Sequence, residues 1–227
     1  MRKIMIGAMT SLDGVMQAPG GPHEDPIGDF RYGGWVAPYF DAVLGEAVGE
    51  MFAQPFDLLL GRKTYDIFAA HWPYVGADDP IGPLFDRVTK YVATRNPNLQ
   101  LGWQNSQNLG ADVADAVRRL KNEEGPDLLT QGSTQLLHTL FKHDLVDEIH
   151  LSIFPVVLGA GKRLFVDGIS PGALKLVSSR VSGSGVTVNK YVRDGQIRTG
   201  NFQMEPPTEA ELRRRRNLIT DGDHKFE

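Results

Sequence analysis

Strand-like and helix-like segments alternate through the first two thirds of the chain, and this alternation limits the folds that the chain can adopt. Short apolar runs of strand length lie at residues 3–10, 57–60, 90–94 and 127–130, and a short polar strand is expected near residues 99–104. Between these runs lie segments whose apolar residues recur three and four positions apart, which is the helical period. Parallel strands joined by crossover helices have this order of elements. The chain is therefore predicted to form an α/β domain with a largely parallel sheet.

The expected helices are recognised by their apolar stripes and by the residues at which they begin. The clearest stripe follows Pro38, a residue suited to the first turn of a helix; its members are Phe40, Val43, Leu44, Ala47, Val48, Met51 and Phe52. A second helical stretch begins at Gly61. Two more have stripes over residues 113–120 and 136–141, and Ser133 is the expected N-cap of the last.

In the last third of the chain, strand follows strand. Three strands are expected, at residues 148–154, 173–181 and 186–193, with turn residues between them. This succession predicts an antiparallel edge on the sheet. The sequence thus predicts one domain, residues 1–199, followed by a C-terminal tail, residues 200–227.

The composition excludes several classes of protein. Lys and Arg total 24 against 28 Asp and Glu in 227 residues, a net charge of −4, so the chain is not expected to attract nucleic acid or an anionic membrane. Cysteine is absent and the six histidines are scattered singly, so neither a disulfide nor a metal site is expected. Without a signal peptide or an apolar run of ~18 residues, the protein is expected to be soluble and cytoplasmic.

Two junctions between a strand and a helix combine small, hydroxyl and basic residues. They are Gly61-Arg62-Lys63-Thr64 and Gly132-Ser133-Thr134, and Arg95 follows the strand at 90–94. The N–H groups at a helix N-terminus can hold phosphate, and glycine lets a ligand approach the backbone. Ligands of open parallel sheets bind at the carboxyl ends of the strands. A local anion site is one interpretation, and ordinary turns with solvated basic residues are the other.

The common nucleotide motifs are missing from the sequence. No G-x-G-x-x-G follows a strand, and Gly159-Ala160-Gly161-Lys162-Arg163 lacks the first glycine and the Ser or Thr of a P-loop. An anion site in this chain would therefore be of another kind.

Three sets of residues carry a resemblance to a known family. They are Ser11-Leu12-Asp13-Gly14, then Gly61-Arg62-Lys63-Thr64-Tyr65, and a block formed by Gly132-Ser133, Leu145-Val146-Asp147-Glu148-Ile149, Pro155-Val156-Val157-Leu158-Gly159-Ala160-Gly161 and Leu164-Phe165. Over about residues 2–193 the chain resembles the dihydrofolate-reductase-like superfamily. Within it, the chain is most similar to the reductase domain at the C-terminus of the bifunctional riboflavin-biosynthesis deaminase-reductase. The resemblance implies an α/β fold with a mixed sheet of eight or nine strands, mostly parallel with an antiparallel C-terminal edge and flanked by helices.

The resemblance also implies an NADPH site and assigns residues to it. By position, Ala8 and Met9 would face the nicotinamide, with Gly14 in the turn that follows their strand. The phosphates and the adenosine would be held by Gly61, Arg62, Lys63, Thr64, Thr94, Arg95, Gly132, Ser133 and Thr134. Because Arg62, Lys63 and Arg95 can meet the extra phosphate, NADPH is expected to bind better than NADH.

The implied activity is that of an NADPH-dependent reductase of a small heterocyclic substrate, resembling 5-amino-6-(5-phosphoribosylamino)uracil reductase. In that enzyme an acidic residue stands two places before the glycine of the third motif, where this chain has Thr130. Two alternatives stay open, a dihydrofolate or pteridine reductase and a non-catalytic NADPH-binding protein. Because 227 residues hold only the reductase, no deaminase domain is expected.

Asp41 is the candidate catalytic residue. In dihydrofolate reductases a carboxylate near the start of the first helix protonates the pterin, and Asp41 is nearest to that place. The alternative is that the helix dipole alone favours an acidic residue there.

A homodimer is the expected assembly. Strands that form a sheet edge near the C-terminus need cover, and a second copy is a common solution. Relatives in the resembled family tend to pair through this half. Cover by the tail from Gly200 is the alternative.

Overall fold

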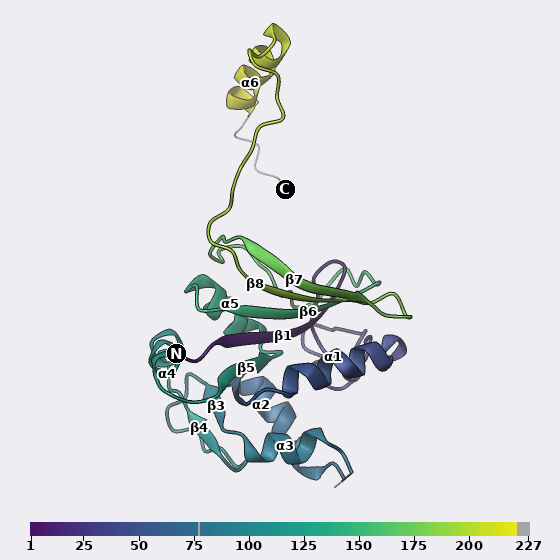
Figure 1. The fold of residues 1–227 in the computed structure, drawn as a ribbon, viewed down its shortest axis with the longest axis vertical. Helices are drawn as coiled ribbons and strands as arrows, with labels where there is room; N and C mark the ends of the chain where they lie inside the picture. Colours follow the sequence, from purple (N-terminus) through teal and green to yellow (C-terminus); the bar gives the residue numbers. More distant parts are fainter. Residues whose placement is uncertain (77, 222–227) are drawn as a thin grey trace. The chain divides into compact units, whose positions relative to one another are not determined.

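The computed structural model describes residues 1–76 and 78–221, with only the backbone described for residues 219–221. Contacts within the chain divide it into two units, Met1–Gln196 and Ile197–Glu227. The first unit contains a mixed sheet flanked by helices (Figure 1), and each unit is considered by itself.

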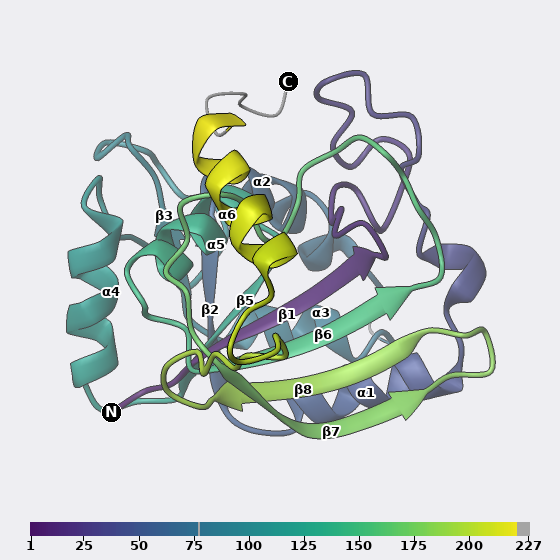
Figure 2. The same cartoon turned by 90° about the horizontal axis from the view of Figure 1, so that it is seen from above.

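The sheet of the first unit has eight strands in the order β4-β3-β2-β5-β1-β6-β8-β7. The strands are β1 (Ile4–Ser11), β2 (Phe56–Gly61), β3 (Lys90–Ala93), β4 (Ser106–Asn108), β5 (Asp127–Gln131), β6 (Glu148–Phe154), β7 (Leu174–Val181) and β8 (Thr187–Arg193). Neighbours from β4 to β6 are parallel, whereas β8 is antiparallel to both β6 and β7. Figure 2 shows β1, β6, β8 and β7 side by side. The predicted α/β class with an antiparallel C-terminal edge is confirmed.

In residues 1–76 and 78–196, five α-helices follow or connect the strands. They are α1 (Ala42–Phe52), α2 (Arg62–Ala69), α3 (Ile81–Arg87), α4 (Val113–Asn122) and α5 (Thr134–Lys142). Short 3-10 helices lie at Ala37–Tyr39 and Trp72–Tyr74.

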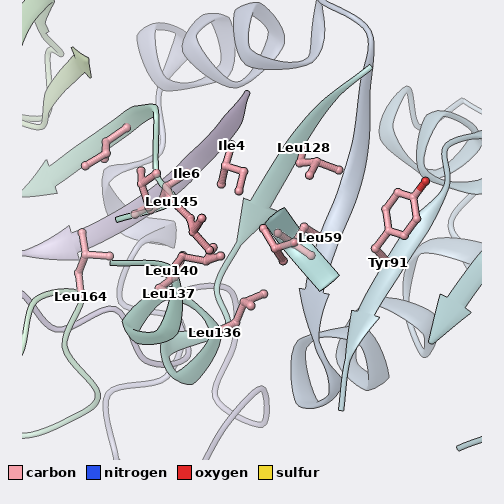
Figure 3. Packing of buried hydrophobic residues seen from close by; sticks show 14 of the residues in the cluster. Ile4, Ile6, Leu59, Tyr91, Leu128, Leu136, Leu137, Leu140, Leu145 and Leu164 are labelled. Atoms are coloured by element: carbon pink, nitrogen blue, oxygen red, sulfur yellow. The ribbon is translucent and has the colours of Figure 1, made fainter. Parts of the chain in front are cut away.

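Apolar side chains form a layer on each face of the sheet, because alternate residues of a strand point to opposite faces. One layer contains Ile4, Ile6, Leu59 and Leu128 of the strands and apolar residues of α4 and α5. Figure 3 shows Leu136, Leu137 and Leu140 of α5 in this layer. The other contains Met5, Leu58, Leu60 and Leu129 of the strands with residues of α1, α2 and α3. The central strands are thus covered on both faces, as their continuous apolar runs predict.

The first helix begins later than the sequence predicts. Pro38 belongs to the 3-10 helix, the backbone is extended at Phe40 (φ −72°, ψ 118°), and α1 begins after its N-cap Asp41. Phe40 is 52% exposed, so its assignment to the apolar stripe is wrong. The break places Phe40 outside the helical register of the stripe.

The strand expected near residues 99–104 is also wrong, because β4 lies at Ser106–Asn108. Trp103 is buried, and its backbone N–H donates to the Tyr65 hydroxyl at 2.9 Å while its indole N–H donates to Asp86 at 2.6 Å. The Trp103 backbone N–H is therefore bonded to a side chain and not to a neighbouring strand.

The segment at residues 159–163, which resembles a P-loop, contacts the long loop after β1 and holds it in place. Asp13 accepts hydrogen bonds from the N–H groups of Leu158 (3.1 Å) and Gly159 (2.9 Å), and the side chains of Lys162 and Asp25 form an ion pair. Gly161 has φ +132°, and a Cβ there would lie 2.5 Å from a methyl carbon of Val15. The glycine thus has a packing role.

The second unit contains α6 (Glu209–Asp221). Glu211 forms ion pairs with Arg214 and Arg215 within this helix. In the part of the chain that the structure describes, no helix is both long and apolar enough to cross a membrane.

Candidate active site

A cavity of about 1800 Å³ runs past the carboxyl ends of β2, β3 and β5 and continues along β1, β6, β8 and β7. Of the residues predicted to bind the cofactor, all except Gly14 line it. They are Ala8, Met9, Gly61, Arg62, Lys63, Thr64, Thr94, Arg95, Gly132, Ser133 and Thr134. Residues from distant parts of the sequence are therefore brought to one site, as the two-junction pattern predicts; their individual roles stay predictions.

The two strand-to-helix junctions touch each other. The Gly61 N–H donates to the Ser133 hydroxyl at 2.8 Å, and Ser133 itself is in the left-handed region (φ 57°). Ser133 occupies the N-cap position of α5 but its side chain does not cap that helix. The predicted N-cap position is therefore confirmed, but the hydroxyl makes no capping bond and instead holds the start of α2 beside the start of α5. Two helix N-termini thus face one space.

Basic side chains at these junctions differ in whether their charge is paired. Arg62 forms an ion pair with Asp66 one turn along α2. Lys63 and Arg95 are exposed, line the cavity, and have no ion pair within residues 1–76 and 78–221. Two cations near two helix N-termini make this half of the cavity suited to phosphate groups.

Ser133→Ala is expected to raise the Kd for NADPH about fivefold, because the Gly61 N–H loses its acceptor and a hydrogen bond of this kind contributes about 1 kcal/mol. Calorimetric titration of both proteins measures the change. Ser170→Ala is the matched control, since its hydroxyl donates to the Lys142 carbonyl outside the cavity. An unchanged Kd in Ser133→Ala would show that the contact between the junctions is unimportant for the cofactor.

Gly14 is in the turn that follows β1 and does not line the cavity. Its φ is +79°, its N–H donates to the Ser11 carbonyl, and its carbonyl accepts from the Leu164 N–H. The positive φ of the turn explains why a glycine stands at this position. Cofactor binding by Gly14 stays a prediction.

Asp41 caps α1 and does not line the cavity. Its carboxylate accepts from the Leu44 N–H (3.2 Å) and from the N–H (3.3 Å) and hydroxyl (3.2 Å) of Ser184. Desolvation raises the pKa of Asp41, but hydrogen bonds from Leu44, Ser182 and Ser184 outweigh it and hold that pKa below its usual value. The observed role is that of a helix cap, and proton donation by Asp41 stays a prediction.

The other half of the cavity contains a charged cluster that sequence reasoning missed. Glu148 and His150 of β6 and Lys190 of β8 meet there, and His150 and Lys190 line the cavity. Glu148 and His150 are two positions apart on a predicted strand, so they point to one face. That spacing was the available signal, but Lys190 is 40 or more residues away and only the sheet pairing brings it to them.

A family model described as the RibD C-terminal domain matches residues 2–188. The chain belongs to this family. Among curated proteins, the uncharacterized protein YyaP of Bacillus subtilis (strain 168) is 30% identical over 197 residues, which cover 86% of this chain and 96% of YyaP.

Solved structures share the fold at lower identity. A putative riboflavin biosynthesis protein from Shewanella sp. PV-4 matches with a TM-score of 0.55 and 20% identity, covering 85% of this chain and 99% of that one. Dihydrofolate reductase from Enterococcus faecalis, complexed with NADP(H) and RAB-propyl, matches with a TM-score of 0.54 and 14% identity, covering 85% and 96%. The fold is therefore dihydrofolate-reductase-like, as the sequence motifs predict.

Proposed function

We propose that the protein is an NADPH-dependent reductase of a small heterocyclic substrate. The observation that carries the proposal is the anion site in the cavity, where two helix N-termini are joined by the bond from Gly61 to Ser133 and flanked by the unpaired Lys63 and Arg95. Membership of the RibD C-terminal domain family and the likeness to a reductase complexed with NADP(H) support it.

The residues of this half fit a dinucleotide phosphate. Gly132 has φ +63°, and a Cβ there would lie 3.3 Å from the Thr64 hydroxyl oxygen, so this glycine lets the two junctions pack closely. The pyrophosphate would be held by the N–H groups at the start of α2 and α5, and the 2′-phosphate by Lys63 and Arg95. Bound NADPH supplies the hydride, so the protein has mainly to orient the nicotinamide and the substrate.

The test is NADPH oxidation by the full chain with 5-amino-6-(5-phosphoribosylamino)uracil and with dihydrofolate as separate substrates. Oxidation with the first supports a reductase like that of riboflavin biosynthesis, and oxidation with dihydrofolate alone supports a folate reductase. NADPH binding without oxidation by either compound contradicts turnover of these substrates and favours a non-catalytic NADPH-binding protein.

We also propose that the protein is a homodimer and that β7 is the pairing edge. β6 lies inside the sheet, between β1 and β8, whereas β7 is at the end of the strand order. Four apolar side chains of β7 are exposed, Leu174, Leu176, Val177 and Val181. An apolar edge strand with unpaired backbone groups favours pairing with a second copy.

Light scattering at micromolar concentration is expected to give twice the 25.0 kDa of one chain. Val177→Lys should shift the mass toward one chain, because an edge lysine opposes strand pairing. Lys175→Arg, on the same strand, is the control. A wild-type mass of one chain would contradict the dimer.

A further inference from the structure

The substrate half of the cavity has a floor formed by one row of residues across five strands. In the sheet register, Gln131 pairs with Gly7, Gly7 with His150, His150 with Lys190, and Lys190 with Ser178. All five line the cavity. A Cβ on Gly7 would lie 2.7 Å from the sulfur of Met51, so this face of the sheet is the one under α1. His150 therefore pairs with the residue before Ala8 on β1, in the segment that is predicted to face the nicotinamide, and Lys190 lies one strand farther away.

Glu148 fixes two polar members of this row, His150 and Lys190. Its Oε1 accepts from His150 Nε2 at 2.6 Å and from Lys190 Nζ at 2.6 Å. The Glu148 side chain is 8% exposed, against 24% for His150 and 35% for Lys190. Desolvation raises the pKa of Glu148, but hydrogen bonds from Lys190 and His150 outweigh it and hold that pKa below its usual value. The carboxylate is thus ionised under its two partners.

Lys190 and His150 each have hydrogen-bonding atoms that are not used within the cluster and can bind a ligand. An ammonium has three donors and no acceptor, and Lys190 uses one donor on Glu148. A carboxylate can only accept, so a hydrogen of the His150 ring is on Nε2, and in the neutral form of that ring Nδ1 is an acceptor. Within the described residues, His150 Nδ1 has no hydrogen bond. A donor and an acceptor are therefore offered from neighbouring register positions.

The other cations of this half already have partners. Both terminal nitrogens of Arg180 donate to Glu50 of α1, at 3.0 and 2.7 Å. Arg163 donates to the carbonyls of Asp13 and Gly159. Arg163 also forms an ion pair with Asp13, and Lys162 forms one with Asp25. These cations are therefore paired, in contrast to Lys63 and Arg95 of the cofactor half.

We propose that Lys190 and His150, positioned by Glu148, determine substrate specificity by binding a lactam edge, –CO–NH–, of a planar heterocycle. Lys190 donates to the carbonyl oxygen, and His150 Nδ1 accepts from the adjacent ring N–H. This proposal rests on the proposed reductase function and deepens it. An amino group in place of the carbonyl puts a donor against the Lys190 ammonium, which cannot accept.

Two pteridines of the same size test this edge. Lumazine carries carbonyl groups at ring positions 2 and 4, and 2,4-diaminopteridine carries amino groups there. Each is titrated calorimetrically into the full chain, with and without NADP⁺. The wild type is expected to bind lumazine at least tenfold more tightly, because a site built to pair with a polar group rejects an analogue that leaves it unpaired.

Lys190→Met is expected to remove this preference, and Lys190→Arg to retain part of it. Lys175→Met on β7 is the matched control, because Lys175 is exposed and does not line the cavity; it should keep the wild-type ratio. An unchanged Kd for NADPH and an unchanged Tm show that a variant is folded. If Lys190→Met does not fold, His150→Phe replaces it, with the same loss of preference expected.

Equal affinity for the two pteridines, tighter binding of the diamino compound, or a preference that persists in Lys190→Met would overturn the proposal. Binding of NADP⁺ without binding of either pteridine would overturn it too, while leaving the reductase function standing. Failure to bind NADP⁺ would instead contradict the reductase function, and the ratio of the two pteridines would still decide the lactam edge.

Discussion

Replacing both Lys63 and Arg95 by methionine is expected to raise the Kd for NADPH about a hundredfold and to change the Kd for NADH much less. The two side chains line the cavity beside the start of α2 and the end of β3 and have no ion pair in the described residues. Two charge-assisted hydrogen bonds to the 2′-phosphate together contribute on the order of 3 kcal/mol, which corresponds to this factor. NADH lacks that phosphate. Calorimetric titration at one salt concentration measures the Kd of NADPH and of NADH for the wild type and for the double variant.

A second double variant, Arg87→Met with Arg119→Met, removes the same charge from exposed positions outside the cavity. It should leave the ratio of the two constants unchanged, since neither side chain lines the cavity and salt screens exposed charges. If the control variant loses as much NADPH affinity as Lys63→Met with Arg95→Met, the effect is one of net charge and the 2′-phosphate assignment is wrong.

Arg2→Met is expected to lower the free energy of unfolding by about 3–5 kcal/mol. Arg2 is 3% exposed and forms an ion pair with Asp57, which is 8% exposed. The guanidinium also lies over the Tyr91 ring, 5.3 Å from its centroid. Without Arg2, the Asp57 carboxylate stays buried with only the hydrogen bond from the Thr89 N–H, at 3.1 Å. Urea unfolding followed by circular dichroism measures the loss.

Removing the carboxylate as well should recover part of this stability. In Arg2→Met with Asp57→Asn no buried charge is left unpaired, so the loss is expected to be smaller than in Arg2→Met alone. Lys3→Met, at the exposed neighbouring position, should change the free energy of unfolding by less than about 0.5 kcal/mol. A loss below about 1 kcal/mol in Arg2→Met would show that the pair contributes little.

The predictions that held rest on local signals. The strand at residues 148–154 has the bounds of β6, because its apolar pattern and flanking turns are both local. The two glycine-containing junctions could be recognised because each is contiguous in sequence. Their meeting in one cavity follows from the parallel order of the strands, which the alternation of elements predicts.

The failed strand prediction at residues 99–104 lies beside side-chain packing that periodicity does not reveal, including the bond from Trp103 to the distant Tyr65. Lys90 is fully buried, and its ammonium donates to the carbonyls of Phe85 (2.7 Å), Asp86 (3.1 Å) and Val88 (3.0 Å) at the end of α3. It also lies over the Trp103 ring, 4.3 Å from its centroid. A lysine at the start of a strand gives no sign of this in the sequence. The Trp103 ring that packs on Lys90 belongs to the segment where a strand was expected.

The cluster of Glu148, His150 and Lys190 could be predicted from the sequence only in part. Its two residues on β6 share a face by simple alternation, so the local half of the cluster was visible. Lys190 on β8 could not be predicted as the third member, because its place beside His150 follows only from the pairing of β6 with β8. That pairing depends on the length of the connection through β7. Charged groups on different strands become a site only when the register is known.

Titration of NADPH and NADH into the full-length wild-type protein tests the central claim most directly. Calorimetry at one salt concentration is expected to show one NADPH per chain, with a Kd about a hundredfold below that of NADH, because the two cofactors differ by one phosphate that Lys63 and Arg95 are placed to bind. Equal dissociation constants, or no binding of NADPH, would contradict the account.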